Sequence, residues 1–363
     1  CYIGIDIGAV SVTAGLLTDN PSDSEPRGWI ACPHFVGDDG EVMWISPYRR
    51  TRGHPLAAAC ELLEEILAVI SPENITAICL TGSGSSLAVD KLNTHRTNEF
   101  QAIATGLQAT GVSVTTVFEM GGETSKYLRL ARETDGALSI IDYATNGDCA
   151  AGTGSFLDQQ AGRLQYAIED VAKLVGQAER SAQVAGRCSV FAKSDMIHAQ
   201  QKGYCPAEVL GGLCDAVARN FRAAVVRSHP VEAPVAMIGG VASNAAVVNS
   251  LRKAFDLDAE ELIVPDTHRH TSAIGAACAA RKMGAKAPNL AGLSEIHRSG
   301  DTRCGTFPTT PPLSMENVLL LRDRVGIYAG ANTTLPVKAY LGIDIGSVST
   351  NVVAIDEAGR VIT

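Results

Sequence analysis

The stretch YIGIDIGAVSVTAGLL, residues 2–17, decides the fold that we predict for this chain. Apolar and β-branched residues flank a tight turn at Gly8, which predicts the two strands of a β-hairpin. Asp6 stands on the first strand, and Ser11 follows the small residues of the turn. Backbone N–H groups of such a turn can bind phosphate while the carboxylate faces Mg²⁺. An ordinary hairpin fits the same pattern, so this stretch alone leaves both interpretations open.

A second acidic hairpin is predicted from TTVFEMGGETSKYLRL, residues 115–130. It contains a strand, a Gly-Gly turn and a return strand, and Glu119 stands where Asp6 stands in the first hairpin. Two such hairpins in one chain favour the phosphate interpretation. Because the chain has neither a GxxxxGKS/T segment nor a GxGxxG turn after a strand, a P-loop or a Rossmann site is not supported.

A third glycine turn lies in VAMIGGVASNAAVVNSLRKAF, residues 235–255. The pattern predicts a buried strand that ends at Gly239 and Gly240, followed by an amphipathic helix that opens near Ser243 or Asn244. A helix N-terminus behind a glycine turn suits the ribose and base side of a nucleotide.

The opening stretch is repeated near the end of the chain. YLGIDIGSVSTNVVAI, residues 340–355, matches residues 2–17, and eight of the first ten positions are identical. Since internal repeats reveal architecture, we expect a second domain of the same kind at 340–363 and a chain that is a piece of a longer protein. Residues 285–339 are predicted to be a linker with one short helix at MENVLLLRDRV, residues 315–325.

The composition describes a globular chain without a signature of nucleic-acid or membrane binding. Of 363 residues, 46% are hydrophobic, and the formal net charge is -9. There is no basic stripe for nucleic acid, and the longest uncharged apolar stretch is interrupted by Gly, Ser and Asn, so no membrane span is expected. The ten cysteines form neither a disulfide framework nor a CxxC zinc spacing, which favours a reducing cytoplasm.

One cysteine, Cys149, lies in NGDCAAGTGSF, residues 146–156, ahead of a helix that the apolar spacing predicts over residues 155–176. A helix N-terminus favours negative charge and lowers the pKa of a nearby thiol. The thiolate is then a better metal ligand or nucleophile, although a packed free thiol fits this position equally well.

Together these motifs resemble the superfamily of actin, Hsp70 and sugar-kinase ATPases (ASKHA). The segment GDCAAGTGSFLDQQAGRL, residues 147–164, narrows the resemblance to the BadF/BadG/BcrA/BcrD ATPase family, the activators of 2-hydroxyacyl-CoA dehydratases and related benzoyl-CoA reductase subunits. The resemblance covers residues 2 to about 284, and the repeat at Tyr340 is similar to larger family members with two ATPase domains.

The resemblance implies an α/β fold of two ribonuclease-H-like subdomains with a nucleotide cleft between them. The first subdomain is expected to hold residues 1–112 and a returning helix at 273–284, and the second residues 113–270. In this cleft ATP or ADP would bind with Mg²⁺. The family commonly reads DIGGQDTK where this chain reads EMGGETSK, so Glu119 replaces an Asp and Glu123 a Gln.

By this resemblance, the nucleotide site has three groups of residues. The expected catalytic carboxylates are those of Asp6, Glu119 and Glu123, and Asp6 is expected to face Mg²⁺. The residues expected to bind the phosphates are Gly8, Ala9, Val10, Ser11, Gly121 and Gly122. The remaining residues of the nucleotide-binding set are Lys126, Gly239, Gly240, Asn244 and Gly275. The Lys126 ammonium either balances the negative charge of the phosphates or lies on the surface.

The resemblance also implies a [4Fe-4S] cluster shared between two copies of the domain. Each copy is expected to supply Cys149 and Cys188, the latter in GRCSVFAKSD. Fe–S clusters are held by four cysteine thiolates, so two copies, as a homodimer or as a pseudo-dimer with the second repeat, are required.

Three classes of function follow from these observations. The first is an ATP-hydrolysing activator that takes electrons from ferredoxin or flavodoxin and passes them, one at a time and at low potential, to a CoA-ester dehydratase or reductase. The second is a small-molecule kinase of the same fold, of the N-acetylhexosamine kinase type, which needs no cluster. The third is a nucleotide-responsive scaffold without enzymatic activity.

Overall fold

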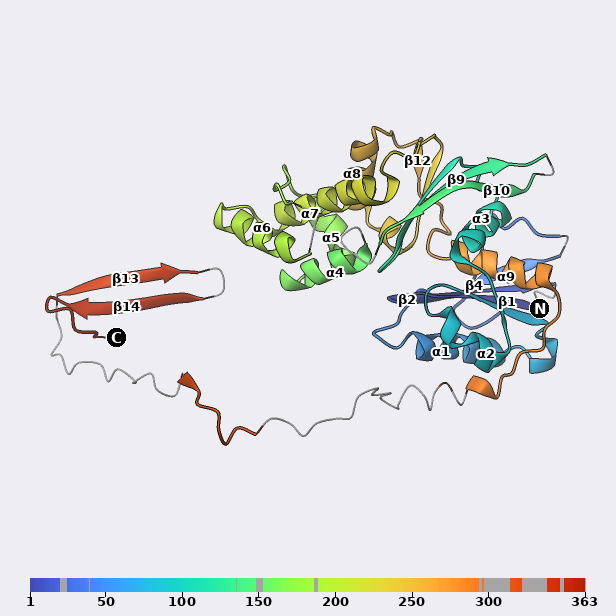
Figure 1. Ribbon diagram of the computed structural model, residues 1–363, viewed down its shortest axis with the longest axis horizontal. Helices are drawn as coiled ribbons and strands as arrows, with labels where there is room; N and C mark the ends of the chain where they lie inside the picture. The colour runs from blue at the N-terminus through green and yellow to red at the C-terminus, as the bar shows by residue number, and fades with distance from the viewer. Residues whose placement is uncertain are drawn as a thin grey trace. The chain divides into compact units, whose positions relative to one another are not determined.

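The computed structural model describes residues 1–19, 25–38, 40–134, 136–147, 153–185, 189–293, 296, 314–321, 338–346 and 349–362. Its chain divides into two compact units, Cys1–Thr302 and Arg303–Thr363. The first unit contains two β-sheets with helices packed on them, and the second contains a β-hairpin (Figure 1).

The first sheet has the strand order β3-β4-β2-β1-β6-β7, with β5 paired to β2. Its strands are β1 (Tyr2–Ile7), β2 (Ser11–Thr18), β3 (Ile30–Ala31), β4 (Val42–Ile45), β5 (Arg49–Arg50), β6 (Ala77–Thr81) and β7 (His95–Arg96). The predicted hairpin is β1 and β2, which pair antiparallel, while β6 pairs parallel to β1 on its other side.

The second sheet repeats this connectivity in the order β10-β9-β8-β11-β12. Its strands are β8 (Thr116–Met120), β9 (Ser125–Arg132), β10 (Leu138–Thr145), β11 (Val235–Ile238) and β12 (Leu262–Ile263). Here β8 and β9 form the antiparallel hairpin, and β11 pairs parallel to β8. Two sheets with the same hairpin-plus-parallel-strand plan confirm the predicted fold of two ribonuclease-H-like halves, while the boundary at residue 112 stays a prediction.

The helices form layers on both sheets. They are α1 (Pro55–Leu67), α2 (Val89–Leu92), α3 (Glu99–Ala109), α4 (Gly154–Arg163), α5 (Ile168–Val175), α6 (Ser189–Gln201), α7 (Pro206–Asn220), α8 (Ala245–Phe255) and α9 (Thr271–Met283), with 3₁₀ turns η2 (Pro72–Asn74), η3 (Ser85–Leu87) and η5 (Gly240–Ser243) and a π-turn η4 (Phe221–Val226). Helices α3 and α9 lie between the two sheets (Figure 1). Helix α9 is the predicted returning helix.

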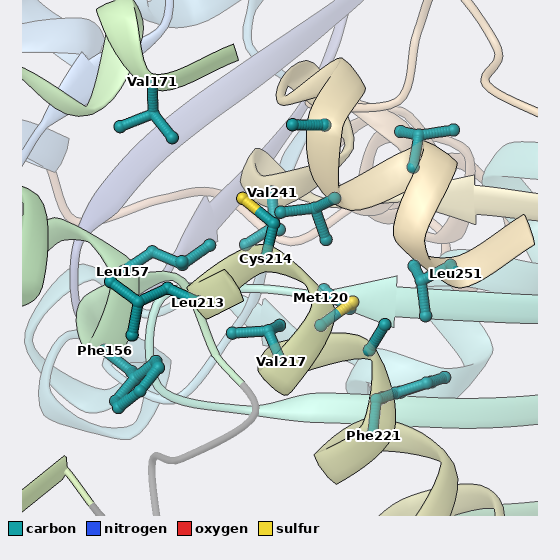
Figure 2. Packing of buried hydrophobic residues seen from close by; sticks show 14 of the residues in the cluster. Met120, Phe156, Leu157, Val171, Leu213, Cys214, Val217, Phe221, Val241 and Leu251 are labelled. Atoms are coloured by element: carbon teal, nitrogen blue, oxygen red, sulfur yellow. The ribbon is translucent and has the colours of Figure 1, made fainter. Parts of the chain in front are cut away.

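The two largest clusters of buried apolar side chains hold the outer helices on the sheets. Helix α1 packs on the first sheet through Leu62 and Leu63 against Ile3 and Ile5, all of them buried. Helices α4, α7 and α8 pack on the second sheet in the larger cluster, in which Met120 lies among their apolar side chains (Figure 2). Burial of apolar surface is the main force that stabilises such layers.

Two expected helices differ from the structure, the second of them over its described part. The helix predicted over residues 155–176 is broken into α4 and α5, because Gln165 adopts a left-handed backbone with φ of 63° and turns the chain between them. Amphipathic spacing continues across the break, so it did not reveal this turn. In the linker, the described residues 314–321 form a turn and no α-helix.

The second unit contains the repeat as an antiparallel hairpin of β13 (Ala339–Ile345) and β14 (Thr350–Asp356). Its turn closes through a hydrogen bond from Gly346 N–H to the Ser349 carbonyl at 2.9 Å, as Gly8 N–H bonds the Ser11 carbonyl at 3.0 Å in the first hairpin. The prediction of a second domain at this point remains open, while the predicted hairpin is confirmed.

Candidate nucleotide-binding site

The turn of the first hairpin is anchored by a neighbouring loop. Thr51 donates its backbone N–H to the Val10 carbonyl at 2.8 Å and its hydroxyl to the Ala9 carbonyl at 2.7 Å. With two of its carbonyls held in this way, the turn has a defined shape. Residues 8–11 line a small pocket of about 80 Å³.

The turn of the second hairpin is held from two sides. The Asn146 side chain accepts the Ser125 N–H at 2.8 Å and donates to the Glu123 carbonyl at 3.2 Å. From the other side, the first N–H groups of α4, at Gly154 and Ser155, donate to the carbonyls of residues 121 and 122 at 2.9 and 2.8 Å. These bonds satisfy donors that a helix N-terminus otherwise leaves unpaired.

The two turns meet face to face. A Cβ atom on Gly122 would lie 2.3 Å from a methyl carbon of Val10, so only glycine allows this approach. The glycine turns of both sheets therefore border the same pocket.

A charged group lies behind the turns. The Lys126 ammonium is 2.9 Å from a Glu119 oxygen, 2.5 Å from a Glu99 oxygen and 2.9 Å from the Thr124 hydroxyl. Burial disfavours the charged ammonium, but the two glutamates outweigh it and raise the pKa of Lys126, so this residue stays protonated. Burial, followed by the charges of Glu99 and Glu119, raises the pKa of Asp6 to about 7.

Beside this group lies a larger cavity of about 530 Å³, within the range of small-molecule sites. Leu157, Ile168, Ala172 and Val241 give it an apolar wall. Asn244 lies at its edge and caps α8 through its side-chain oxygen, which accepts N–H groups of the first helical turn.

The Asn244 side chain is also a free donor. The residue is 8% exposed, and its Nδ2 atom has no hydrogen-bond partner within the described residues. Because an unpaired buried N–H group costs free energy, a ligand acceptor in the cavity would satisfy it.

The structure brings most of the predicted site residues together. Those that line one or both pockets are Asp6, Gly8, Ala9, Val10, Ser11, Glu119, Gly121, Gly122, Glu123, Lys126, Gly239, Gly240 and Asn244. Lys126 is only 5% exposed, so it is not a surface lysine.

One predicted residue of the nucleotide site is not found there. Gly275 lies outside both pockets, where its Cα faces the Ala102 carbonyl and the Gly106 amide of α3, and we assign it to helix packing. Cys149 and Cys188 lie outside the described residues. Among the described residues, no three His, Cys, Asp or Glu side chains are placed to hold a metal ion by themselves.

Sequence reasoning missed several residues of the site. Glu99 is the first residue of α3 and follows the N-cap Asn98, whose side chain accepts the Gln101 N–H at 2.8 Å. Asparagine is a preferred N-cap residue, so the sequence TNEF, residues 97–100, did carry a signal for the start of a helix. Nothing local indicated that this helix end faces the cleft. The larger cavity is also lined by Arg50 and Arg269, and neither arginine belongs to a sequence motif that indicated this position.

Two equivalent sheets that direct glycine turns and carboxylates to a shared cavity define a nucleotide-binding protein of the actin, Hsp70 and sugar-kinase class. More particularly, residues 3–280 match the BadF/BadG/BcrA/BcrD ATPase family, and the chain belongs to it.

Relatives with described activities support this membership. The activator of lactoyl-CoA dehydratase from Anaerotignum propionicum is 30% identical over 284 residues, which are 78% of this chain and 98% of that protein. The (R)-2-hydroxyglutaryl-CoA dehydratase activating ATPase of Acidaminococcus fermentans is 28% identical over the same share of each chain. One of the benzoyl-CoA reductase subunits of Thauera aromatica is 24% identical over 76% of this chain and 90% of that protein.

Solved structures agree on the fold. Component A of the Acidaminococcus fermentans (R)-2-hydroxyglutaryl-CoA dehydratase superposes with a TM-score of 0.63 and 23% identity, covering 78% of this chain and 98% of that one. The activator of the 2-hydroxyisocaproyl-CoA dehydratase from Clostridium difficile, with bound ADPNP, superposes with a TM-score of 0.61 and 22% identity, covering 82% and 96%. Within the described parts of this chain, none of the helices combines the length and apolar character that a membrane crossing requires.

Proposed function

We propose that this chain is an ATP-hydrolysing activator that carries a [4Fe-4S] cluster between two copies of its domain and passes electrons at low potential to a CoA-ester dehydratase or reductase. The observation that carries the nucleotide part is the contact of the two glycine turns beside the Asp6, Glu119 and Lys126 group. Membership of an ATPase family that includes dehydratase activators supports the rest.

In this proposal the adenosine occupies the larger cavity and the phosphates extend to the turns. The apolar wall formed by Leu157 and Ile168 suits the base, and the free Nδ2 donor of Asn244 suits a ribose or base acceptor. A relative with bound ADPNP has the same fold. ATP and ADP are therefore the ligands that we expect.

The residues present also fit Mg²⁺. Three carboxylates, those of Asp6, Glu99 and Glu119, share a pocket with the Lys126 ammonium, so a divalent cation would balance their remaining charge. Mg²⁺ keeps waters and phosphate oxygens as ligands and needs few side chains, and it supplies neutralisation of phosphate charge. Since the pKa of Asp6 is about 7 in the free protein, Asp6 would release its proton as the cation binds.

Hydrolysis needs a positioned water more than covalent chemistry. The small pocket of about 80 Å³, where we place the phosphates, is bordered by Glu119, Glu99 and Glu123. Their carboxylates can accept hydrogen bonds from such a water. Lys126 holds the first two in place through its ion pairs. We therefore assign the orientation of the water to these carboxylates.

The cluster is proposed at Cys149 and Cys188. Helices α4 and α6 begin at Gly154 and Ser189, shortly after the two cysteines, and helix N-termini stabilise the negative charge of a bound cluster. Two thiolates per domain require a twin domain, from a second chain or from the repeat. Ferredoxin or flavodoxin is the proposed donor, in a reducing cytoplasm that keeps the thiols free.

Helix α4 can transmit a movement of the nucleotide site to the proposed cluster. Its first N–H groups bond the carbonyls of the phosphate turn at residues 121 and 122, so a shift of that turn is passed directly to the helix end that follows Cys149. Nucleotide-dependent movement of such elements is a common kind of switch.

The test is anaerobic purification of the protein with measurement of iron, sulfide and visible absorbance, before and after addition of MgATP and MgADP. We expect about two irons per domain, since four are shared by two domains. Cys149→Ala and Cys188→Ala should each abolish the brown colour, whereas Cys205→Ala, at an exposed cysteine, should keep it. Colourless wild-type protein that transfers phosphate from ATP to an amino sugar would instead establish the kinase alternative.

A further inference from the structure

Arg50 joins the two halves of the first unit across the larger cavity. It stands on β5 of the first sheet, and its guanidinium forms ion pairs with Asp158 of α4 and, at 3.4 Å, with Glu169 of α5. Both helices belong to the hydrophobic core of the second half. All three side chains line the cavity, and about a third of the Arg50 and Asp158 side chains is exposed.

The neighbouring arginine provides a contrast. Arg49 shares the same two-residue strand, but its partners are Glu61, at 3.0 Å, and Glu65, both on α1 of the same half. Two adjacent arginines thus have two carboxylates each, and only those of Arg50 belong to the opposite half.

The Arg50 ion pairs close a ring of contacts around the nucleotide site. On one side, Arg50 pairs in the sheet with Ser11, and the next residue, Thr51, holds the carbonyls of the first phosphate turn. On the other side, Asp158 stands one turn beyond Gly154, whose N–H holds the second phosphate turn. Both turns are therefore connected to each other through the Arg50 and Asp158 pair.

We propose that Arg50 is a positioning residue that keeps the two phosphate turns and the cavity-lining helices in register for nucleotide binding. This inference rests on the proposed function of the site. A ligand that contacts both halves binds more tightly when they are already aligned, because less ordering free energy is lost on binding. Removal of the guanidinium then weakens binding because the two halves are no longer held in register before the ligand binds.

The experiment measures the affinity for MgADP by calorimetry for wild type, Arg50→Gln, Asp158→Asn and the double variant. For a partly exposed pair we expect a loss of about fivefold in Arg50→Gln. Asp158→Asn should lose about as much, and the double variant little more than either, because one interaction is removed in all three. Arg49→Gln is the matched control, expected to keep wild-type affinity.

Salt provides a readout that a general folding defect would not follow. Since mobile ions screen partly exposed pairs, the difference between wild type and Arg50→Gln should shrink as ionic strength rises from about 0.05 to 0.5 M. The circular dichroism of each variant verifies its fold.

Three results would overturn the inference. Unchanged affinity in Arg50→Gln removes the positioning role. Tighter binding in Asp158→Asn, together with weaker binding in Arg50→Gln, would mean that Arg50 contacts phosphate directly. Equal losses in Arg49→Gln and Arg50→Gln would mean a general effect of the strand. Failure of the wild type to bind MgADP would instead overturn the proposed function, and this inference with it.

Discussion

The first hairpin and its repeat have nearly the same sequence and the same backbone register, but their burial differs. Asp6 pairs with Thr13 in one, and Asp344 pairs with Asn351 at the same position in the other. Ile5 is fully buried, whereas its counterpart Ile343 is 58% exposed. A hairpin can thus be specified locally without the surroundings that make it part of a site.

The difference arises from what packs against each strand. In the first hairpin a Cβ atom on Gly4 would lie 2.1 Å from the Ala277 amide nitrogen, because the backbone of α9 rests directly on β1. The counterpart, Gly342, has only Val353 of its own hairpin nearby among the described residues. Strand β6 and helix α9 therefore bury the first hairpin and fix it beside the candidate site.

The largest expected contrast is between Asp6→Asn and Asp344→Asn. Asp6 borders the small pocket that we propose for the phosphates, so its replacement should lower Mg²⁺-dependent ATP hydrolysis by about 100-fold or more. Asp344 is exposed, and Asp344→Asn should leave the rate unchanged. Steady-state phosphate release measures both. An equal loss in Asp344→Asn would mean that the second hairpin contributes to hydrolysis.

A second contrast concerns packing, between Gly4→Ala and Gly342→Ala. Because a methyl group at position 4 collides with backbone atoms of α9, we expect a loss of about 3 kcal/mol in the free energy of unfolding. Denaturant unfolding followed by the fluorescence of Trp29 and Trp44, both in the first unit, measures it. Gly342→Ala should leave this transition in place, within about 0.5 kcal/mol. A shift there would reveal a partner packed closely on the second hairpin.

The smallest contrast is in pH dependence. Burial and neighbouring carboxylates raise the pKa of Asp6 from 3.8 to about 7, so between about pH 4 and 7 the folded state holds a proton that the unfolded state has released. The nucleotide-free wild type should therefore lose stability as the pH rises through this range. Relative to Asp6→Asn, we expect a loss of about 2 kcal/mol between pH 5 and 7.5.

The controls for this measurement are Asp344→Asn and saturating MgADP. Asp344→Asn should follow the wild-type curve, because its side chain is exposed. MgADP should flatten that curve, since the cation favours the ionised form of Asp6. A wild-type curve parallel to that of Asp6→Asn in the absence of ligand would refute the raised pKa.

Much of the fold was predictable because its signals are local. Alternating apolar residues around Gly8 and around Gly121 specify hairpins, and Asn244 marks the start of a helix that the structure confirms. The break between α4 and α5 was not predictable, because a single left-handed residue, Gln165, interrupts a continuous amphipathic pattern.

The candidate site was predictable only in part, for a related reason. Residues within the glycine turns belong to short motifs, and the structure brings them together at one pocket. Gly275 belongs to a small-residue helix, and such spacing serves helix packing as readily as ligand binding. Glu99 and Arg50 act through partners far away in sequence, which no local pattern reveals.

By itself, the sequence determined three hairpins and the family to which the chain belongs, because glycine turns and strand periodicity depend on residues close together in the chain. Only the tertiary structure decided that Lys126 is buried between Glu99 and Glu119 and that Arg50 reaches the opposite half. These features depend on long-range packing and on the burial of charge, which the same local sequence experiences differently in different surroundings.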